Sequence, residues 1–170
     1  MNKSPLQLEH YTLSEISIKP YDGYVATDGV PYPSFNNADF NSAVEFGPAS
    51  REGAAENASL WGIRLSLSCQ AKDGESFPYR FAVGISGILD GSGLPSDNRS
   101  NLVLVNGTSL LYGALRDEVL RLTSRMENGA LMLPTVQFTK LAEDAGKEVI
   151  PPTKPAATKR VAKPKAKAKA

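Results

Sequence analysis

The sequence has very few of the residues that usually build catalytic, metal or disulfide sites. Its 170 residues include one cysteine, Cys69, and one histidine, His10. A structural zinc site needs about four Cys or His ligands and a disulfide needs two cysteines, so neither can form within one chain. A single cysteine is typical of a reducing compartment, which predicts a cytoplasmic protein. We expect no enzyme activity and no cofactor, although a hydrolase that uses carboxylates alone stays open as an alternative.

Long apolar runs and phosphate-binding motifs are also missing. No run approaches the roughly 18 apolar residues of a membrane-spanning helix, and the polar start, Met1–Pro5, predicts no secretory signal. Segment 84–87 reads Gly-Ile-Ser-Gly, which differs from the Gly-x-Ser-x-Gly motif of serine hydrolases. The glycine-rich segment 87–93 is not followed by the Gly-Lys-Ser/Thr of phosphate-binding loops. These features favour a binding protein over an enzyme.

Acidic residues are missing from the last twenty positions. Segment 151–170 carries seven Lys and Arg residues and no acid, whereas residues 1–150 hold eighteen acids against twelve bases, a net charge of −6 (12 − 18). The segment is rich in Pro, Ala and Lys and has one branched apolar residue, Val161, so it cannot bury enough apolar surface to offset its ordering entropy. We therefore expect one domain at 1–150 and a disordered basic tail at 151–170.

The basic tail has two open interpretations. It is either a solubilising extension or an electrostatic tether to an acidic surface, such as nucleic acid, a ribosome, an anionic membrane or an acidic protein. Because the tail has no aromatic residue to stack on bases, any nucleic-acid binding by it would be sensitive to salt and independent of sequence.

The first two thirds of the body have the pattern of β-strands. Apolar residues alternate with small or polar residues at 61–69 and again at 77–87, and Asp73-Gly74 between them is typical of a hairpin turn. Shorter apolar patterns at 6–20 and 40–46 predict two more strands. Strands with one apolar face need another element to cover that face.

A helix after the strands supplies that cover. Asn106 or Thr108 is a candidate N-cap, and Asn128-Gly129 predicts the C-terminal stop. A sheet followed by a helix predicts an α+β fold, with an antiparallel sheet of about four strands, a long helix and a shorter C-terminal helix at 139–150. The apolar stripe of the long helix recurs at helical spacing and consists of Leu111, Leu115, Val119, Leu122 and Met126.

Residues 109–138 combine this helix, the glycine stop and an apolar Leu-Pro-x-Val-x-Phe stretch. The segment resembles the C-terminal half of the SecB family of protein-export chaperones, which has a Leu-Phe-Pro-Tyr-Ala-Arg-Glu helix start and a later Leu-x-Pro-Val-Asn-Phe stretch. Three positions depart from that pattern: Gly113 replaces proline, Ala114 replaces tyrosine and Gln137 replaces asparagine. The matching positions are Leu111, Tyr112, Arg116, Asp117, Val119, Leu133, Pro134, Val136 and Phe138.

The resemblance implies a function and partners. SecB-like chaperones hold unfolded client polypeptides in apolar grooves without ATP, and they assemble through helices as tetramers, each a dimer of dimers. Their acidic sheet surface docks the SecA translocase motor. Relatives of the family serve single antitoxins, so a general role in protein export and a dedicated role both stay open. For this chain the resemblance implies an oligomer interface at Leu110, Gly113 and Leu120, which lie away from the apolar stripe.

The insertion at 21–37 is a candidate client-binding element. It holds three tyrosines and a phenylalanine, although its Asp-Gly, Val-Pro and Tyr-Pro pairs are typical of turns. Either these rings pin the loop to the body, or they form a recognition surface, because tyrosine gives a large rigid contact area with a polar tip. SecB-like chaperones use a crossover loop at this place as one wall of the client groove. The expected client-binding residues are therefore Tyr21, Tyr24, Tyr32, Phe35, Leu133, Val136 and Phe138.

Two other classes of protein stay open. A nucleic-acid-associated protein would act through the basic tail, and removal of 151–170 would abolish its salt-dependent binding. A dedicated adaptor would use the same groove for one fixed partner, and it would not protect unrelated unfolded proteins from aggregation.

Overall fold

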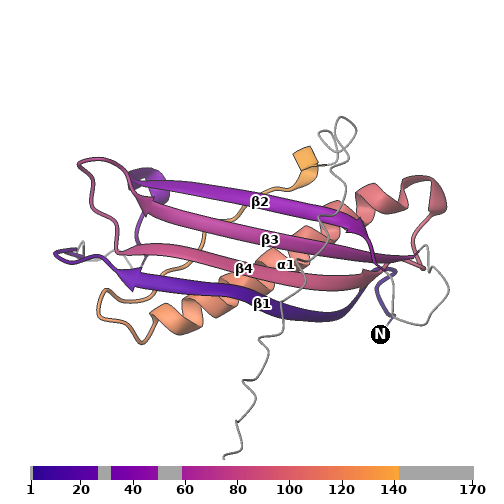
Figure 1. Cartoon of the computed structure of the whole chain (residues 1–170), viewed down its shortest axis with the longest axis horizontal. Helices are drawn as coiled ribbons and strands as arrows, with labels where there is room; N and C mark the ends of the chain where they lie inside the picture. The colour runs from indigo at the N-terminus through magenta and orange to yellow at the C-terminus, as the bar shows by residue number, and fades with distance from the viewer. Residues whose placement is uncertain (1, 27–31, 50–58, 142–170) are drawn as a thin grey trace, which may run out of the picture.

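The computed structural model describes residues 2–26, 32–49 and 59–141 (Figure 1). Four strands, β1 (Gln7–Pro20), β2 (Ala38–Pro48), β3 (Leu60–Ala71) and β4 (Tyr79–Asp90), form a sheet that helix α1 (Arg99–Thr123) covers on one face. Two short 3-10 turns, η1 (Phe35–Asn37) and η2 (Ser96–Asn98), precede β2 and α1. The predicted α+β fold is therefore confirmed. The basic tail and residues 142–150 of the expected last helix lie outside the described residues.

The strand order explains why the insertion between β1 and β2 is long. All neighbouring strands are antiparallel and the order is β1-β4-β3-β2, so β1 and β2 form opposite edges of the sheet. The chain must pass the ends of β4 and β3 to go from one edge to the other. We call residues 21–37 the crossover. At the same end, β3 and β4 are joined by the predicted hairpin turn, in which Gly74 has a φ of 77°.

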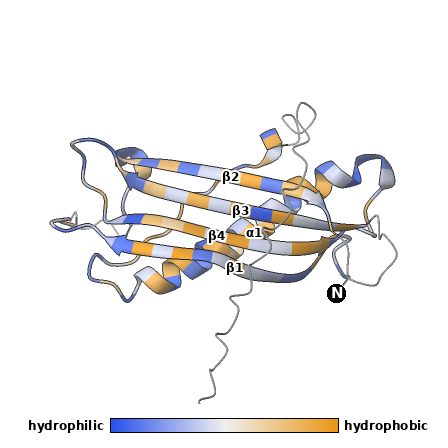
Figure 2. Ribbon diagram, viewed as in Figure 1, coloured by the Kyte–Doolittle hydropathy of each residue, from blue (hydrophilic) through white to orange (hydrophobic). Residues whose placement is uncertain are grey.

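Hydrophobic and hydrophilic residues alternate along the central strands (Figure 2), and the apolar face is buried on the side of α1, as the alternation predicts. Leu65 pairs with Ile85 and Leu67 pairs with Val83, and all four side chains are buried. Residues between them in the sequence face the open side of the sheet. There Arg64 lies 4.0 Å from the carboxylate of Glu45 and donates a hydrogen bond to Ser86. The core therefore lies between the sheet and α1, and the other face of the sheet is exposed.

Strand β1 has the predicted extent but is less regular than a simple alternation. Its pairing with β4 shifts register between Leu8 and His10 and again between Leu13 and Glu15. Each shift marks a β-bulge, which adds a residue and changes the spacing of side chains on one face. As a result, the apolar residues of β1 all pair opposite odd-numbered residues of β4, on the helix side of the sheet. They are Leu8, Tyr11, Leu13, Ile16 and Ile18.

Helix α1 begins earlier than predicted. Asn106 and Thr108 are not N-caps, because the helix starts at Arg99 and Thr108 is fully buried within it. Polar and glycine residues at 106–108 suggested a boundary, but packing overrides that local preference. A Cβ on Gly107 would come 2.7 Å from a methyl group of Ile63 and 2.8 Å from one of Leu89, so a larger residue there would have to displace these side chains of the sheet. The predicted stop is close, since the helix ends at Thr123 and the following turn runs to Gly129, with φ 78°.

The connector, residues 130–138, closes the core beside α1. The hydroxyl groups of Tyr79 and Tyr112 donate hydrogen bonds to the carbonyl oxygens of Gly129 and Pro134. Burial raises the pKa of Tyr112 to about 12, so its hydroxyl group remains protonated at neutral pH and continues to donate. Between these two anchors the connector buries Leu131 and Leu133.

A third anchor of the connector gives a testable prediction. The buried hydroxyl of Thr123 accepts a hydrogen bond from the Leu131 N–H and donates to the Val119 carbonyl, both at 2.8 Å. Thr123→Val keeps the shape but leaves the Leu131 N–H without a partner, so we expect a loss of about 1–3 kcal/mol in unfolding free energy. Thr135→Val, on the exposed side of the connector, is the matched control and should change stability by less than about 0.5 kcal/mol. Equal effects in urea unfolding would contradict this anchor.

The cysteine gives a second prediction. Cys69 is buried in β3, and burial, followed by the charge of Asp39, raises the pKa of its thiol to about 12. At pH 8 the thiolate fraction is then about 1 in 10,000, and only the thiolate reacts. We expect no reaction with a disulfide reagent such as Ellman's reagent in the native protein and complete reaction in denaturant. Rapid reaction without denaturant would show that β3 is accessible.

Candidate functional site

The described residues carry two groups of exposed apolar side chains. We call the first the crossover surface, which consists of Tyr21, Tyr24, Val25 and Tyr32. The second is the β1 surface, which consists of Tyr11, Leu13 and Ile16. Tyr21 and Ile16 are each 48% exposed, whereas most apolar residues of β3 and β4 are buried. Exposed apolar groups gathered in this way are typical of interaction sites.

The start of the crossover is held in place by its backbone. The Tyr21 N–H donates to the Pro78 carbonyl at 2.8 Å. The Asn128 side-chain amide, beyond the end of α1, donates to the same carbonyl at 2.8 Å and to the Tyr21 carbonyl at 3.1 Å. Gly23 then turns the chain with a φ of 84°. Tyr21 and the neighbouring Tyr24 are therefore held at the end of the sheet where the hairpin and the end of α1 meet.

Tyr24 follows the turn at Gly23 and is half-buried. In the same part of the molecule, burial and then the Glu127 carboxylate raise the pKa of Tyr79. The Tyr79 hydroxyl is therefore a protonated donor to the Gly129 carbonyl at neutral pH. Part of the Tyr24 side chain remains exposed.

The end of the crossover packs into the core. The Phe35 ring lies 5.0 Å from that of Phe77 and 5.5 Å from that of Phe40, both edge-to-face. The Lys72 N–H donates to the Asn37 carbonyl at 3.0 Å, which fixes the start of β2 against the hairpin. Of the four aromatic residues predicted in this segment, the structure therefore exposes the three tyrosines wholly or in part, and it packs Phe35 against the core.

The three connector residues expected in the client groove differ in how far they are buried. Leu133 is 0% exposed and Phe138 is 9% exposed, with its ring 5.5 Å from that of Tyr112. Val136 is half-buried against the core. Leu133 and Phe138 therefore belong to the core beneath the surface. Of the three residues, Val136 is the most exposed.

Partly exposed apolar side chains continue along the β2 edge. Phe40, Val44 and Phe46 are half-buried on the helix side of β2. The Phe46 ring stacks on that of Trp61 at 4.9 Å, and the Trp61 indole N–H has no hydrogen-bond partner within the described part of the chain. This strip links the crossover end of the sheet to the other end of β2. In the described residues β2 pairs only with β3, so its outer edge can receive an extended chain.

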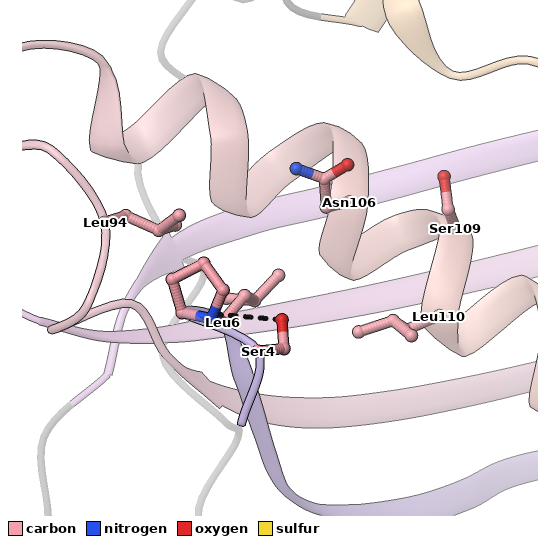
Figure 3. A pocket seen from close by; sticks show the side chains of 7 residues that line it. Ser4, Leu6, Leu94, Asn106, Ser109 and Leu110 are labelled. Carbon is pink, nitrogen blue, oxygen red and sulfur yellow. Dashed lines mark hydrogen bonds between the residues drawn. The ribbon is translucent and has the colours of Figure 1, made fainter. Parts of the chain in front are cut away.

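The three residues predicted at an oligomer interface, Leu110, Gly113 and Leu120, differ in exposure. Leu110 is 47% exposed and lines a shallow cleft with Leu6 and Leu94 (Figure 3). Gly113 is exposed with no atom within 4 Å of a Cβ placed on it, and Leu120 is half-buried. An added side chain at Gly113 therefore meets nothing within the chain itself.

The β1 surface was missed by the sequence analysis. Its apolar residues, Tyr11, Leu13 and Ile16, are spaced by two and then three positions, so they match neither a regular strand nor a helix. The two bulges restore them to one face. An apolar pattern with alternating steps of two and three, in a segment already predicted as a strand, was the signal available in the sequence.

Charge on the open face of the sheet is mixed. Acidic residues Glu15, Asp39 and Glu45 share this face with basic residues Lys19, Arg64 and Arg80, and serines and small residues lie between them. Among the described residues no group of three or more His, Cys, Asp or Glu could hold a metal ion. No helix of the described ranges is long and apolar enough to cross a membrane.

Comparisons with known proteins give partial structural similarity. No family model matches the sequence, and no curated protein matches it. One similar structure is a SecB-like chaperone of Mycobacterium tuberculosis in complex with a peptide from an antitoxin, with a TM-score of 0.42 and 17% identity over 78% of this chain and 91% of that one. Another is a protein of unknown function from Streptococcus agalactiae, with a TM-score of 0.42 and 16% identity over 76% of this chain and 97% of that one.

Proposed function

We propose that the protein is an ATP-independent chaperone that binds unfolded polypeptides at the crossover surface. The observation that carries this proposal is a set of partly exposed tyrosines on a backbone anchored at both ends. Rings on a fixed backbone lose little conformational entropy on binding, so the contact area of each ring contributes more to affinity. The sequence resemblance of 109–138 to SecB chaperones supports the same function independently.

The half-buried strip along β2 extends this surface. Phe40, Val44 and Phe46 offer apolar contacts on one face of β2, with Ser42 between the first two, and the outer edge of β2 offers backbone hydrogen bonds. A client in extended conformation can use both, because β-strand addition takes affinity from main-chain hydrogen bonds and specificity from side-chain contacts. When apolar side chains of a client pack against such a strip, this contact competes with the hydrophobic collapse of the client itself.

We further propose that the chaperone serves protein export. This part of the proposal rests on the sequence resemblance to SecB chaperones, which also implies docking to the SecA motor. The mixed charge of the open sheet face makes that face a weak electrostatic match for a basic partner. Binding of purified SecA, measured with and without the basic tail, tests this form. The alternative is that the same site serves one dedicated partner, for example an antitoxin.

The function is tested by protection of unrelated unfolded proteins. We expect the full chain to suppress thermal aggregation of two clients with no common sequence, in the absence of ATP, at a ratio of a few chaperone chains to each client. Protection of neither client would contradict chaperone activity. Protection restricted to one partner would favour the dedicated adaptor, and protection that is lost with 151–170 and at high salt would favour binding through the tail.

A further inference from the structure

The outer edge of β2 carries a short row of backbone hydrogen-bonding groups at one side of the sheet (Figure 1). The Ala49 N–H donates to the Leu60 carbonyl at 2.9 Å, and the Lys72 N–H donates to the Asn37 carbonyl at 3.0 Å. Both pairs continue the unshifted register of β2 with β3, in which hydrogen-bonded and non-hydrogen-bonded pairs alternate. The odd-numbered residues of β2 therefore bond to β3, and the even-numbered residues direct their N–H and C=O groups outward.

This outward row is limited at both ends. At its start the Ala38 N–H donates to the Phe35 carbonyl of η1. At its end Pro48 has no N–H to donate. An extended chain of about seven residues covers the length between these limits, because paired strands advance equally along a sheet. Within the described residues the outward groups between the limits belong to Phe40, Ser42, Val44 and Phe46, whose side chains lie on the helix side of the sheet.

Ser42 interrupts the apolar side chains of this row. It is exposed, and it pairs with the buried Leu67 of β3. Phe40 and Val44, two positions away on the same face, are half-buried. The hydroxymethyl group of a serine is much smaller than either neighbour, so the apolar row has a gap at position 42.

We infer that this gap takes an aromatic side chain of the client, from the residue that pairs with Ser42 in an antiparallel added strand, an inference that rests on the proposed function. Two residues in an antiparallel hydrogen-bonded pair have their side chains on the same face of the sheet. The ring of the client then has Phe40 and Val44 at its two diagonal positions, about 7–8 Å away and within reach of an aromatic side chain. A ring opposite a small residue on an edge strand also covers the backbone of that residue.

Ser42 is therefore a specificity-determining residue, because it selects the register of the client on β2. A small client residue opposite Ser42 reaches neither diagonal neighbour. Opposite Val44 a ring has Ser42 as one of its diagonal neighbours, so it gains less apolar contact there. The client class that fits best is an extended stretch with one ring opposite Ser42.

The inference is tested with peptides tethered to the full chain in a fixed register. Phe46→Cys provides the tether, and each peptide carries one cysteine and, four residues later, either phenylalanine or alanine. In an antiparallel strand this residue pairs with Ser42 when the cysteine pairs with position 46, at a Cα separation that suits a disulfide. Exchange equilibria with glutathione measure the stability of each adduct. The native Cys69 is buried and does not take part.

We expect the phenylalanine peptide to be favoured over the alanine peptide by about fivefold at this position, and by about twofold or less when the same residues are placed opposite Val44. Adding Ser42→Glu puts a carboxylate in the gap and should abolish the preference. Adding Ala43→Glu, which carries the same charge on the open face, is the matched control and should leave it unchanged. Circular dichroism checks that each variant folds.

Equal preferences in the Ser42→Glu and Ala43→Glu backgrounds would overturn the inference. A chain that shows no preference for phenylalanine opposite Ser42 would also overturn it, and the serine would then serve only to keep the edge polar. If that chain still protects unrelated clients from aggregation, the proposed function stands and only the role of Ser42 is wrong. If the wild-type chain protects no client, both are wrong.

Discussion

Replacement of Leu133 by alanine is expected to destabilise the fold by about 2–5 kcal/mol while client affinity stays unchanged. Leu133 is fully buried: its exposed fraction is 0%, and it packs within the main hydrophobic core. Removing such a side chain leaves a cavity between the connector, α1 and the sheet, which adds to the lost burial energy. Urea unfolding gives the stability, and titration of an unfolded client below the transition gives the affinity.

The matched control for this prediction is Leu110→Ala. Leu110 is 47% exposed on α1, so the same change removes little buried area and should cost less than about 1 kcal/mol. If Leu133→Ala instead kept full stability and lost client binding, Leu133 would be a contact residue of the groove. The placement of the connector leucines in the core would then be wrong.

Replacement of Tyr24 and Tyr32 together by serine is expected to weaken client binding by about 2–4 kcal/mol, or roughly 1–2 kcal/mol for each ring that anchors the client. The stability of the fold should fall by much less than the 3–5 kcal/mol typical of a ring removed from a packed core. Tyr32 is exposed and Tyr24 is half-buried, so neither ring fills the interior. Aggregation suppression and thermal unfolding of the double variant measure the two effects.

Phenylalanine at the same two positions is the matched control. It keeps the apolar area and removes the hydroxyl groups, so we expect most of the client affinity to remain if ring contact carries the binding. A serine variant with unchanged suppression and a sharply lowered melting temperature would mean that the crossover tyrosines are structural. An equal loss of client affinity in the serine and phenylalanine variants would show that the hydroxyl groups, and not the ring contacts, carry the binding.

The regular parts of the fold could be predicted from the sequence because each has a clear period. The odd-numbered residues of β3 and β4 alternate without interruption, and Asp73-Gly74 between them encodes the hairpin turn. The helical stripe of α1 is equally regular, and Leu111, Leu115 and Val119 are buried as expected. Local pattern is sufficient where a single face of each element meets one core.

The remaining features depend on contacts between distant segments. Helix α1 begins at Arg99 and runs through Gly107, which lies against Ile63 of β3 and Leu89 of β4, a contact that no local preference reveals. The bulges of β1 depend on its pairing with β4, so the β1 surface was not visible in the alternation. The tyrosines of the crossover were identified from composition, but the core position of Phe35 follows from its contact with Phe77.

The most direct test of the account is photo-crosslinking from the crossover surface to an unfolded client. A photoreactive phenylalanine replaces Tyr32 in one variant and Asn41, exposed on the open face of the sheet, in another. We expect strong crosslinking of a permanently unfolded client at position 32, competed by excess unlabelled client, and little at position 41. Equal crosslinking at both positions, or crosslinking at 41 alone, would contradict binding of unfolded polypeptides at the crossover surface.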